Sequence, residues 1–183
     1  MRFFTPRFAQ FRYVLRDSVD ARLLREGKLS EHFALSEFTR SATARRHSID
    51  NTPPEEAIQA LNLLVDNVLE PARVALGWPL RVTSGYRSPK LNRKVKGARN
   101  SDHVFGRAAD VEVIPETKAR MFALGRWIQE NCEFKQLIWE YGGEWIHVAY
   151  DPEGNRKEVL EAVKVKNWRG KFVTKYQPFT FLG

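Results

Sequence analysis

Apolar positions along this chain repeat with two different periods, and the change of period separates the predicted helices from the predicted strands. From Phe8 to Arg25 apolar residues recur every three or four positions among charges, which predicts an amphipathic helix that ends at Gly27. A second helix is predicted to start at Thr52, because threonine is a good cap and Glu55 completes a capping box. Its apolar face continues from Leu61 to Leu69.

Four later runs are typical of strands, because they alternate apolar and polar residues or are rich in β-branched residues. These runs are Leu80–Ser84, Arg107–Ile114, Lys135–Glu140 and Glu144–Tyr150. A helical pattern from Glu116 to Asn131 precedes the third run, and Gly142-Gly143 predicts a tight hairpin turn between the last two. Together these elements predict an α+β fold, in which a small antiparallel sheet packs against helices.

The length of 183 residues is enough for one globular domain, which would bury roughly 70% of the surface of the unfolded chain. Within it we expect an N-terminal helical extension (residues 1–28), a main domain (29–151) and a C-terminal helix with a basic, aromatic tail (152–183). The lone Cys132 excludes an intramolecular disulfide and a cysteine-rich metal site. Any metal must therefore bind to His, Asp or Glu.

The formal net charge of +8 favours an anionic partner such as nucleic acid, a membrane surface or a bacterial envelope. The basic loop between Gly85 and Asn100 carries no recognised nucleic-acid motif, so no specific nucleic-acid binding is expected. No run of 18 apolar residues predicts a membrane span. No secretory signal is expected either, because arginines interrupt the N-terminal apolar residues.

Three polar segments are candidates for one site: SGYRSPKLN (84–92), SDHVFGRAAD (101–110) and LIWEYGGEWIHVAY (137–150). His103 and Asp110 lie seven residues apart, and His147 lies within an apolar strand. Two imidazoles and one carboxylate would give zinc three protein ligands and leave a fourth position for water. The other two histidines, His32 and His47, are expected at the surface.

These segments resemble the zinc D-alanyl-D-alanine peptidases, the group of phage endolysins and cell-wall carboxypeptidases whose metal site also occurs in the hedgehog signalling domain. SDHVFGRAAD fits the signature Ser-x-His-x-x-Gly-x-Ala-x-Asp, EWIHVAY resembles the Trp-x-His-Val strand, and SGYRS resembles a third motif. The segment HFALSEFTRSATARRHSIDNTPP resembles the opening of the phage-associated, C-terminal-type subgroup, so the similarity covers about residues 30–150.

The resemblance implies a hedgehog/DD-peptidase-like fold and a Zn²⁺ ion bound by His103, Asp110 and His147. It also implies a guanidinium at Arg87 that binds the substrate or the oxyanion, and cations of this kind stabilise the charge that develops on a tetrahedral intermediate. Arg87 could instead bind a terminal carboxylate of the substrate in bidentate fashion.

The resemblance leaves two carboxylates as candidates for the general base. In many relatives the base stands three residues before the second histidine, which here is Glu144, and in hedgehog-like and phage-type relatives it ends the preceding strand, which here is Glu140. A two-residue turn would pair Glu140 with Trp145 and place Glu140 on the same face as His147. Glu140 is therefore preferred. A bulge or a three-residue turn would reverse this alternation of faces, so Glu144 stays open as the base.

Four further residues are candidates for substrate binding: Ser84, Tyr86, Ser101 and Trp145. Ser101 could support a metal ligand by a hydrogen bond or could simply hold a turn. The aromatic rings could line a groove for a glycan or peptide or could belong to the core.

The leading hypothesis is a zinc-dependent peptidase, a D-Ala-type carboxypeptidase or endopeptidase that hydrolyses amide bonds in peptidoglycan stem peptides or cross-bridges. It is expected to be endolysin-like, made in the cytoplasm and acting at the bacterial cell wall after release at lysis or delivery by a phage or virion. The alternative is a non-catalytic wall-binding or virion structural module of the same fold. The sequence does not indicate the oligomeric state.

Overall fold

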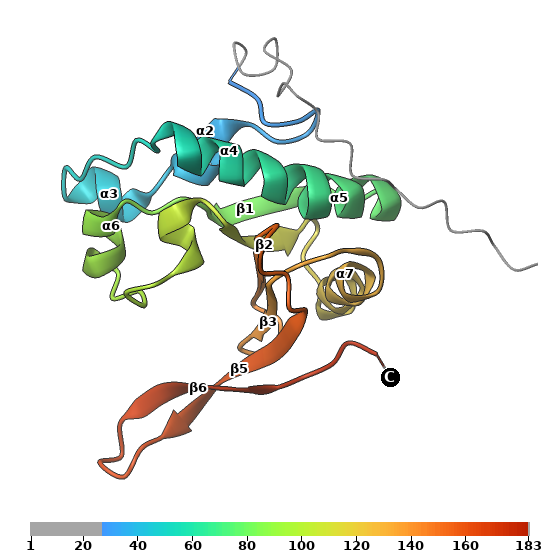
Figure 1. The fold of residues 1–183 in the computed structure, drawn as a ribbon. Helices are drawn as coiled ribbons and strands as arrows, with labels where there is room; N and C mark the ends of the chain where they lie inside the picture. The colour runs from blue at the N-terminus through green and yellow to red at the C-terminus, as the bar shows by residue number, and fades with distance from the viewer. Residues whose placement is uncertain (1–26, 183) are drawn as a thin grey trace, which may run out of the picture.

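The computed structural model describes residues 27–182, so the amphipathic helix expected from Phe8 to Arg25 lies outside the described residues. The described chain begins with helices and continues into a sheet (Figure 1). The helices before the sheet are α2 (Leu35–Thr39), α3 (Ala42–Arg46), α4 (Glu55–Leu64), η1 (Val65–Leu69) and α5 (Glu70–Leu76). Between later strands lie α6 (Pro89–Lys94), the 3-10 turn η2 (Asp102–Phe105) and α7 (Lys118–Asn131).

The segments α4, η1 and α5 follow one another without a break, and η1 is a π-helical turn. Pro71 explains this turn, because proline has no backbone N–H and its ring crowds the carbonyl one turn earlier. The N–H of Glu70 donates instead to the carbonyl of Val65, five residues back.

The start of α4 differs from the prediction in one detail. The helix begins at Glu55, Pro54 is its N-cap residue, and no side chain caps it, so the predicted cap by Thr52 is wrong. Pro54 disfavours a helical conformation in the residue before it, and the helix therefore starts only after the second proline.

Six strands form one sheet in the order β1-β2-β4-β3-β5-β6. Their bounds are β1 Leu80–Ser84, β2 Ala108–Val113, β3 Gln136–Glu140, β4 Trp145–Ala149, β5 Glu158–Lys166 and β6 Phe172–Pro178. The first four agree with the predicted runs to within one residue at each end. The mixed α and β composition confirms the α+β class, but β3 and β5 are parallel, so the sheet is mixed and not purely antiparallel. The end of β4 lies beside the start of β3. From there the chain continues into β5, which pairs with the other edge of β3 and runs parallel to it.

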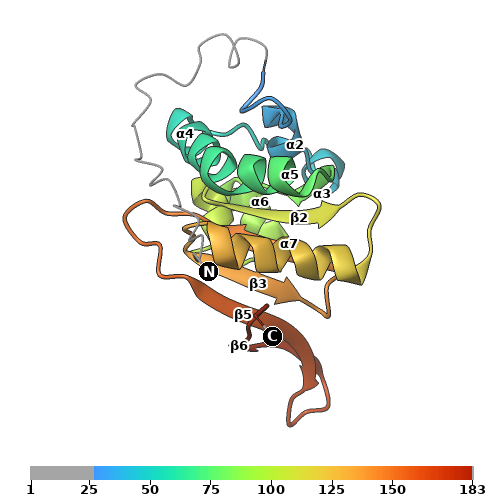
Figure 2. The same ribbon diagram turned by 90° about the vertical axis from the view of Figure 1, so that its right-hand side faces the viewer.

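The two faces of the sheet have different roles. One face belongs to the hydrophobic core, and its buried residues include Leu80, Val82, Val111, Leu137, Ile146 and Val148. Helix α7 lies against this face of the sheet (Figure 2) and contributes Met121, Leu124 and Ile128 to the same core. The opposite face carries the polar residues of β1, β2, β3 and β4. The fold therefore leaves that face for a site.

The C-terminal region corrects the predicted helix after Asp151. Residues 158–178 form the β5–β6 hairpin, which projects from the helices and the central strands (Figure 1). The Glu, Leu, Ala and Lys residues of β5 have good helix propensity, but its three valines favour a strand, and β5 pairs with β3 on one side and β6 on the other.

Beyond β6 the chain returns to the core, where the Phe181 side chain is fully buried. Gly125 of α7 makes room for it, because a Cβ there would lie 2.3 Å from the Phe181 ring. The hairpin is thus anchored at both ends. No helix within residues 27–182 is long and apolar enough to span a membrane.

Candidate metal centre

Strand pairing brings together two of the proposed ligands from distant parts of the sequence. Asp110 of β2 lies directly opposite His147 of β4, and on the other side of β2 Ser84 of β1 lies opposite Asp110. Residues paired in this way project from the same face of a sheet. Their neighbours Val111, Ile146 and Val148 point into the core, so alternation directs Asp110 and His147 away from it.

The third ligand, His103, reaches this face from the turn η2, which precedes β2. Gly106 ends the turn with φ +70°, and a Cβ at this position would lie 2.3 Å from the carbonyl oxygen of Ala57. The sequence therefore requires glycine here. Nδ1 of His103 lies 2.7 Å from the carbonyl oxygen of Gly85, which can only accept a hydrogen bond. The proton of the neutral imidazole is thus on Nδ1, and the Nε2 lone pair faces the site.

The three ligand atoms form a nearly equilateral triangle. Nε2 of His103 lies 3.2 Å from Nδ1 of His147 and 3.3 Å from Oδ1 of Asp110, and the latter two atoms are 2.8 Å apart. A tetrahedral zinc ion with bonds of about 2.0–2.1 Å separates its ligand atoms by about 3.3–3.4 Å. Two sides of the triangle are close to this separation and the third is shorter, at hydrogen-bond length, so the three atoms could together hold a divalent metal ion.

Burial and charge act in opposite directions on the ligands, and the net effect lowers the pKa of both His103 and Asp110. Burial lowers the pKa of His103, although Asp110 acts in the opposite direction. Burial by itself would raise the pKa of Asp110, but the neighbouring imidazoles His103 and His147 outweigh it and hold this pKa well below its usual range. Neutral imidazole and ionised carboxylate are the forms that bind a metal ion.

The two candidate bases occupy different environments. Glu140 lies opposite Trp145, and Ile138 lies opposite His147, as the predicted parity requires. The connection contains four residues, Tyr141 to Glu144, in place of the predicted two-residue turn, and this even number preserves the parity. Glu140 is only 7% exposed, and burial raises its pKa to about 7, with a further increase from Asp110 and a decrease from His147. Glu144 is exposed in the turn.

Arg87 approaches the ligands from the loop after β1. Its backbone N–H donates to the carbonyl of His103 (3.1 Å), and its Nε is buried without a hydrogen-bond partner. Burial lowers the pKa of this guanidinium, while the charge of Asp110 raises it. A buried donor that lacks a partner beside a candidate metal site is suited to a bound anion.

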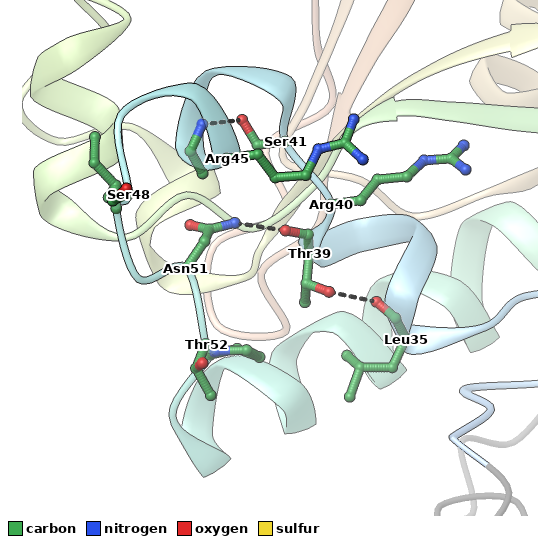
Figure 3. A pocket seen from close by; sticks show the side chains of 11 residues that line it. Leu35, Thr39, Arg40, Ser41, Arg45, Ser48, Asn51 and Thr52 are labelled. Carbon is green, nitrogen blue, oxygen red and sulfur yellow. Dashed lines mark hydrogen bonds between the residues drawn. The ribbon is translucent and has the colours of Figure 1, made fainter.

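Asn51 fixes the segment that carries Arg87, and sequence reasoning missed it. Its Nδ2 donates to the carbonyls of Thr39 (2.8 Å) and Tyr86 (3.1 Å), and its Oδ1 accepts from the N–H of Ser88 (2.7 Å). Figure 3 shows Asn51 at the hollow of about 450 Å³ formed by α2, α3 and the loop to Pro53. The only sequence signal was its position within the segment similar to the opening of the peptidases.

A second hollow, of about 370 Å³, links α3 to the site. It is lined by Ser84, Tyr86, Arg40 and Arg45, among others. The Tyr86 side chain is 5% exposed and belongs to the core cluster. Ser84 therefore has the freer position for contact with a substrate, since it lies opposite Asp110.

The remaining candidates lie at the edges of the site. Ser101 precedes η2, and its side chain does not cap that turn. Trp145 is half-buried, and its ring packs edge-on against Tyr141 at 5.4 Å. Cys132 is buried, and burial raises its pKa to about 12, so its thiol is a poor nucleophile.

A second group of potential ligands within residues 27–182 comprises Glu31, His32 and Glu70. Nδ1 of His32 lies 2.5 Å from a carboxylate oxygen of Glu70, so a hydrogen bond accounts for this contact. His47 is exposed at the end of α3. Both histidines are surface residues, as predicted.

One known family matches the part of the chain that contains His103, Asp110 and His147. The family model for peptidase M15 matches residues 31–149, which is more than half of the chain and includes all three residues. The chain belongs to the peptidase M15 family. M15 peptidases are metal-dependent, and in this M15 protein the ligand triangle is a candidate for the metal site. No curated protein matches the chain. The M15 match ends before β5, so the hairpin lies outside it.

Proposed function

We propose that this M15 protein is a zinc peptidase that hydrolyses amide bonds in the stem peptides or cross-bridges of peptidoglycan. The observation that carries the proposal is the triangle of His103 Nε2, His147 Nδ1 and Asp110 Oδ1, with sides of 2.8–3.3 Å. Two imidazoles and one carboxylate form the ligand set of a catalytic zinc site with an open position. A purely structural zinc site would be closed by a fourth protein ligand.

When bound, zinc would polarise the scissile carbonyl and make water acidic enough to act as a nucleophile near neutral pH. Glu140 is the proposed general base: its carboxylate accepts a proton from the attacking water and delivers it to the leaving amine. A pKa near 7 suits both the uptake of a proton from water and its delivery to the amine near neutral pH. The exposed Glu144 lies outside this buried environment.

Arg87 is proposed to stabilise the negative charge that develops on the carbonyl oxygen. The charge of Asp110 raises the pKa of its guanidinium against the effect of burial, and its buried Nε has no hydrogen-bond partner. A preorganised cation in a water-poor site stabilises such a charge more strongly than it would in water. Ser84, Tyr86, Ser101 and Trp145 are proposed as surrounding substrate contacts, of which Ser84, Ser101 and Trp145 are partly exposed and Tyr86 is buried.

The proposed substrate is a D-Ala-type amide, and the enzyme acts as a carboxypeptidase or endopeptidase at the bacterial cell wall, in the manner of a phage endolysin or virion component. The net charge of +8 supports an anionic polymer as partner. The alternative role is a wall-binding or virion structural module that holds zinc without turnover.

Incubation with purified peptidoglycan tests the proposal. The zinc-loaded protein is expected to release fragments whose masses identify the cleaved amide, and the His147→Ala variant is expected to release none. Zinc binding without release of fragments would favour the structural module. Equal activity of the two proteins would overturn the proposed mechanism.

A further inference from the structure

The face of the sheet that carries the candidate metal centre continues onto the C-terminal hairpin. Glu140 of β3 pairs with Ala162 of β5, and Ala162 pairs with Tyr176 of β6. Paired residues share a face, so Tyr176 lies on the same face as Glu140. The Tyr176 side chain is 53% exposed. The distance along the sheet from Glu140 to Tyr176 is two strand spacings, or about 10 Å.

The same face extends toward the tip of the hairpin through two more cross-strand pairs. Lys164 pairs with Thr174, and Lys166 pairs with Phe172. The ammonium group of Lys166 lies 5.5 Å from the centre of the Phe172 ring, which is 67% exposed. We call the residues Tyr141, Lys164, Lys166, Phe172, Thr174 and Tyr176 the hairpin strip.

Tyr141 connects the strip to the turn beside the candidate site. Its hydroxyl lies 2.7 Å from Oγ1 of Thr174, and Nζ of Lys164 lies 4.9 Å from the centre of its ring. The ring also packs against Trp145, which lies opposite Glu140. The strip is therefore continuous with the rim of the site and is not a separate patch.

The composition of the strip determines the chemistry that it can bind. It contains three aromatic rings and two lysines, and it contains no carboxylate. The nearest acidic residue of β5, Glu161, is out of phase with the strip and bonds to Gln177 on the other face. Exposed aromatic groups on a monomeric protein often mark a binding surface, and the lysines require a partner with negative charge.

We propose that the hairpin strip binds the polymeric substrate, an extended acidic peptide-bearing glycan, on the portion that runs outward from the bond at the metal centre. The identity of this polymer rests on the proposed function. The hairpin residues of the strip, from Lys164 to Tyr176, lie outside the matched family region, whereas Tyr141 lies within it. Stacking on the aromatic rings would supply contact area, and the lysines would pair with carboxylates of the peptide.

A charge-reversal pair with a matched control tests the strip. Lys164→Glu/Lys166→Glu reverses two charges on the strip, whereas Lys171→Glu/Lys175→Glu makes the same change on the same hairpin outside it. Lys175 pairs with Val163 on the opposite face, and Lys171 precedes β6. All four lysines are exposed, so neither pair should disturb the core. Circular dichroism and zinc content of each variant verify this.

Binding to purified, insoluble peptidoglycan is measured by co-sedimentation in the His147→Ala background, which avoids digestion of the polymer. The strip pair is expected to raise the dissociation constant about tenfold, and the control pair less than about twofold. The neutral variant Phe172→Ala/Tyr176→Ala should also weaken binding, and it should do so at high salt, where charge effects are screened. Three outcomes would contradict the proposed role of the strip: an equal loss of binding affinity in both charge-reversal pairs, no loss in either pair, or no binding by the parent protein.

Hydrolysis measurements separate this proposal from the proposed function. With the catalytically intact protein, the strip pair should raise KM for the polymer but leave cleavage of a short soluble stem peptide unchanged. Selective loss of binding in the strip pair without any hydrolysis by the parent would support the strip and contradict the peptidase. Hydrolysis of the polymer with indistinguishable KM values for the two pairs would support the peptidase and contradict the strip.

Discussion

The central strands and the C-terminal hairpin belong to the same sheet, but they are packed very differently. In β2 and β4 one face is buried in the core, and Asp110 and His147 project from the other. In the hairpin most of β5 is half-buried and almost all of β6 is exposed, and Phe172 and Trp168 are 67% and 85% accessible to solvent. A ligand triangle with sides near 3 Å needs a backbone fixed by packing, whereas an exposed hairpin can only present groups for recognition.

The largest effect should come from the carboxylate at the end of β3. Glu140→Gln is expected to keep zinc bound but to lower hydrolysis by a factor on the order of 10²–10⁴, because the amide cannot accept the proton. Glu144→Gln, with the same change in the exposed turn, is the matched control and should retain activity. Turnover of defined stem peptides measures both variants. A greater loss in Glu144→Gln would assign the base to the other carboxylate.

The anchor of the hairpin in the core should have the next largest effect. Phe181→Ala removes a fully buried ring that packs against Trp139, Phe122 and Phe179, so we expect it to lower the free energy of unfolding by about 3–5 kcal/mol. Urea unfolding measures the change. A loss below about 1 kcal/mol would mean that the segment after β6 does not belong to the folded core.

The buried position of Glu140 also predicts a dependence of stability on pH. Its pKa is about 7 in the folded protein and near the ordinary value of 4.5 in the unfolded chain, so the folded protein binds this proton more tightly. The resulting stabilisation is complete below pH 4.5 and is lost as the pH rises through 7.

The Glu140→Gln variant has no carboxyl group to deprotonate at this position, so it does not lose this stabilisation as the pH rises. In metal-free protein, its stability relative to the parent should therefore increase between pH 4 and pH 8 by a few kcal/mol, on the order of 3. Urea unfolding of both proteins across this range measures the difference. A constant difference would contradict the raised pKa.

The smallest effect should come from the tip of the hairpin. Trp168 is 85% exposed and contacts Arg169, whose guanidinium carbon lies 4.3 Å from the centre of its ring. Trp168→Ala should change the free energy of unfolding by no more than about 0.5 kcal/mol, in contrast to Phe181→Ala. A large loss of stability would show that the tip is not the exposed region described above.

The central strands could be predicted from the sequence, because burial of one face imposes a clear pattern on them. The run Leu80–Ser84 and the parity that pairs Glu140 with Trp145 both agree with the structure. The predicted turn length was wrong, but the pairing was still correct. The observed turn includes Tyr141 and Glu144, and these two extra residues, one on each side, leave the register unchanged. The convergence of His103, Asp110 and His147 could be proposed from their residue types in three polar segments, and the resemblance of these segments to a known family supported it.

The hairpin and the supporting residues could not be predicted in the same way. The strand β5 mixes residues that favour a helix with three valines that favour a strand, so its local pattern is ambiguous and pairing with β3 and β6 decides its conformation. Asn51 lies in a loop and contacts residues up to 37 positions away, so no local pattern reveals it. Tyr176 reaches the face of Glu140 through pairing that spans three strands.

Calorimetric titration of zinc into the metal-free protein is the most direct test of the central claim that His103, Asp110 and His147 form a metal site. The parent should bind one zinc ion at His103, Asp110 and His147, and His147→Ala should weaken this binding at least about 100-fold. His32→Ala, which alters the other group of potential ligands, should bind zinc as the parent does. Undiminished binding by His147→Ala, or loss of binding in His32→Ala alone, would contradict the proposed metal centre.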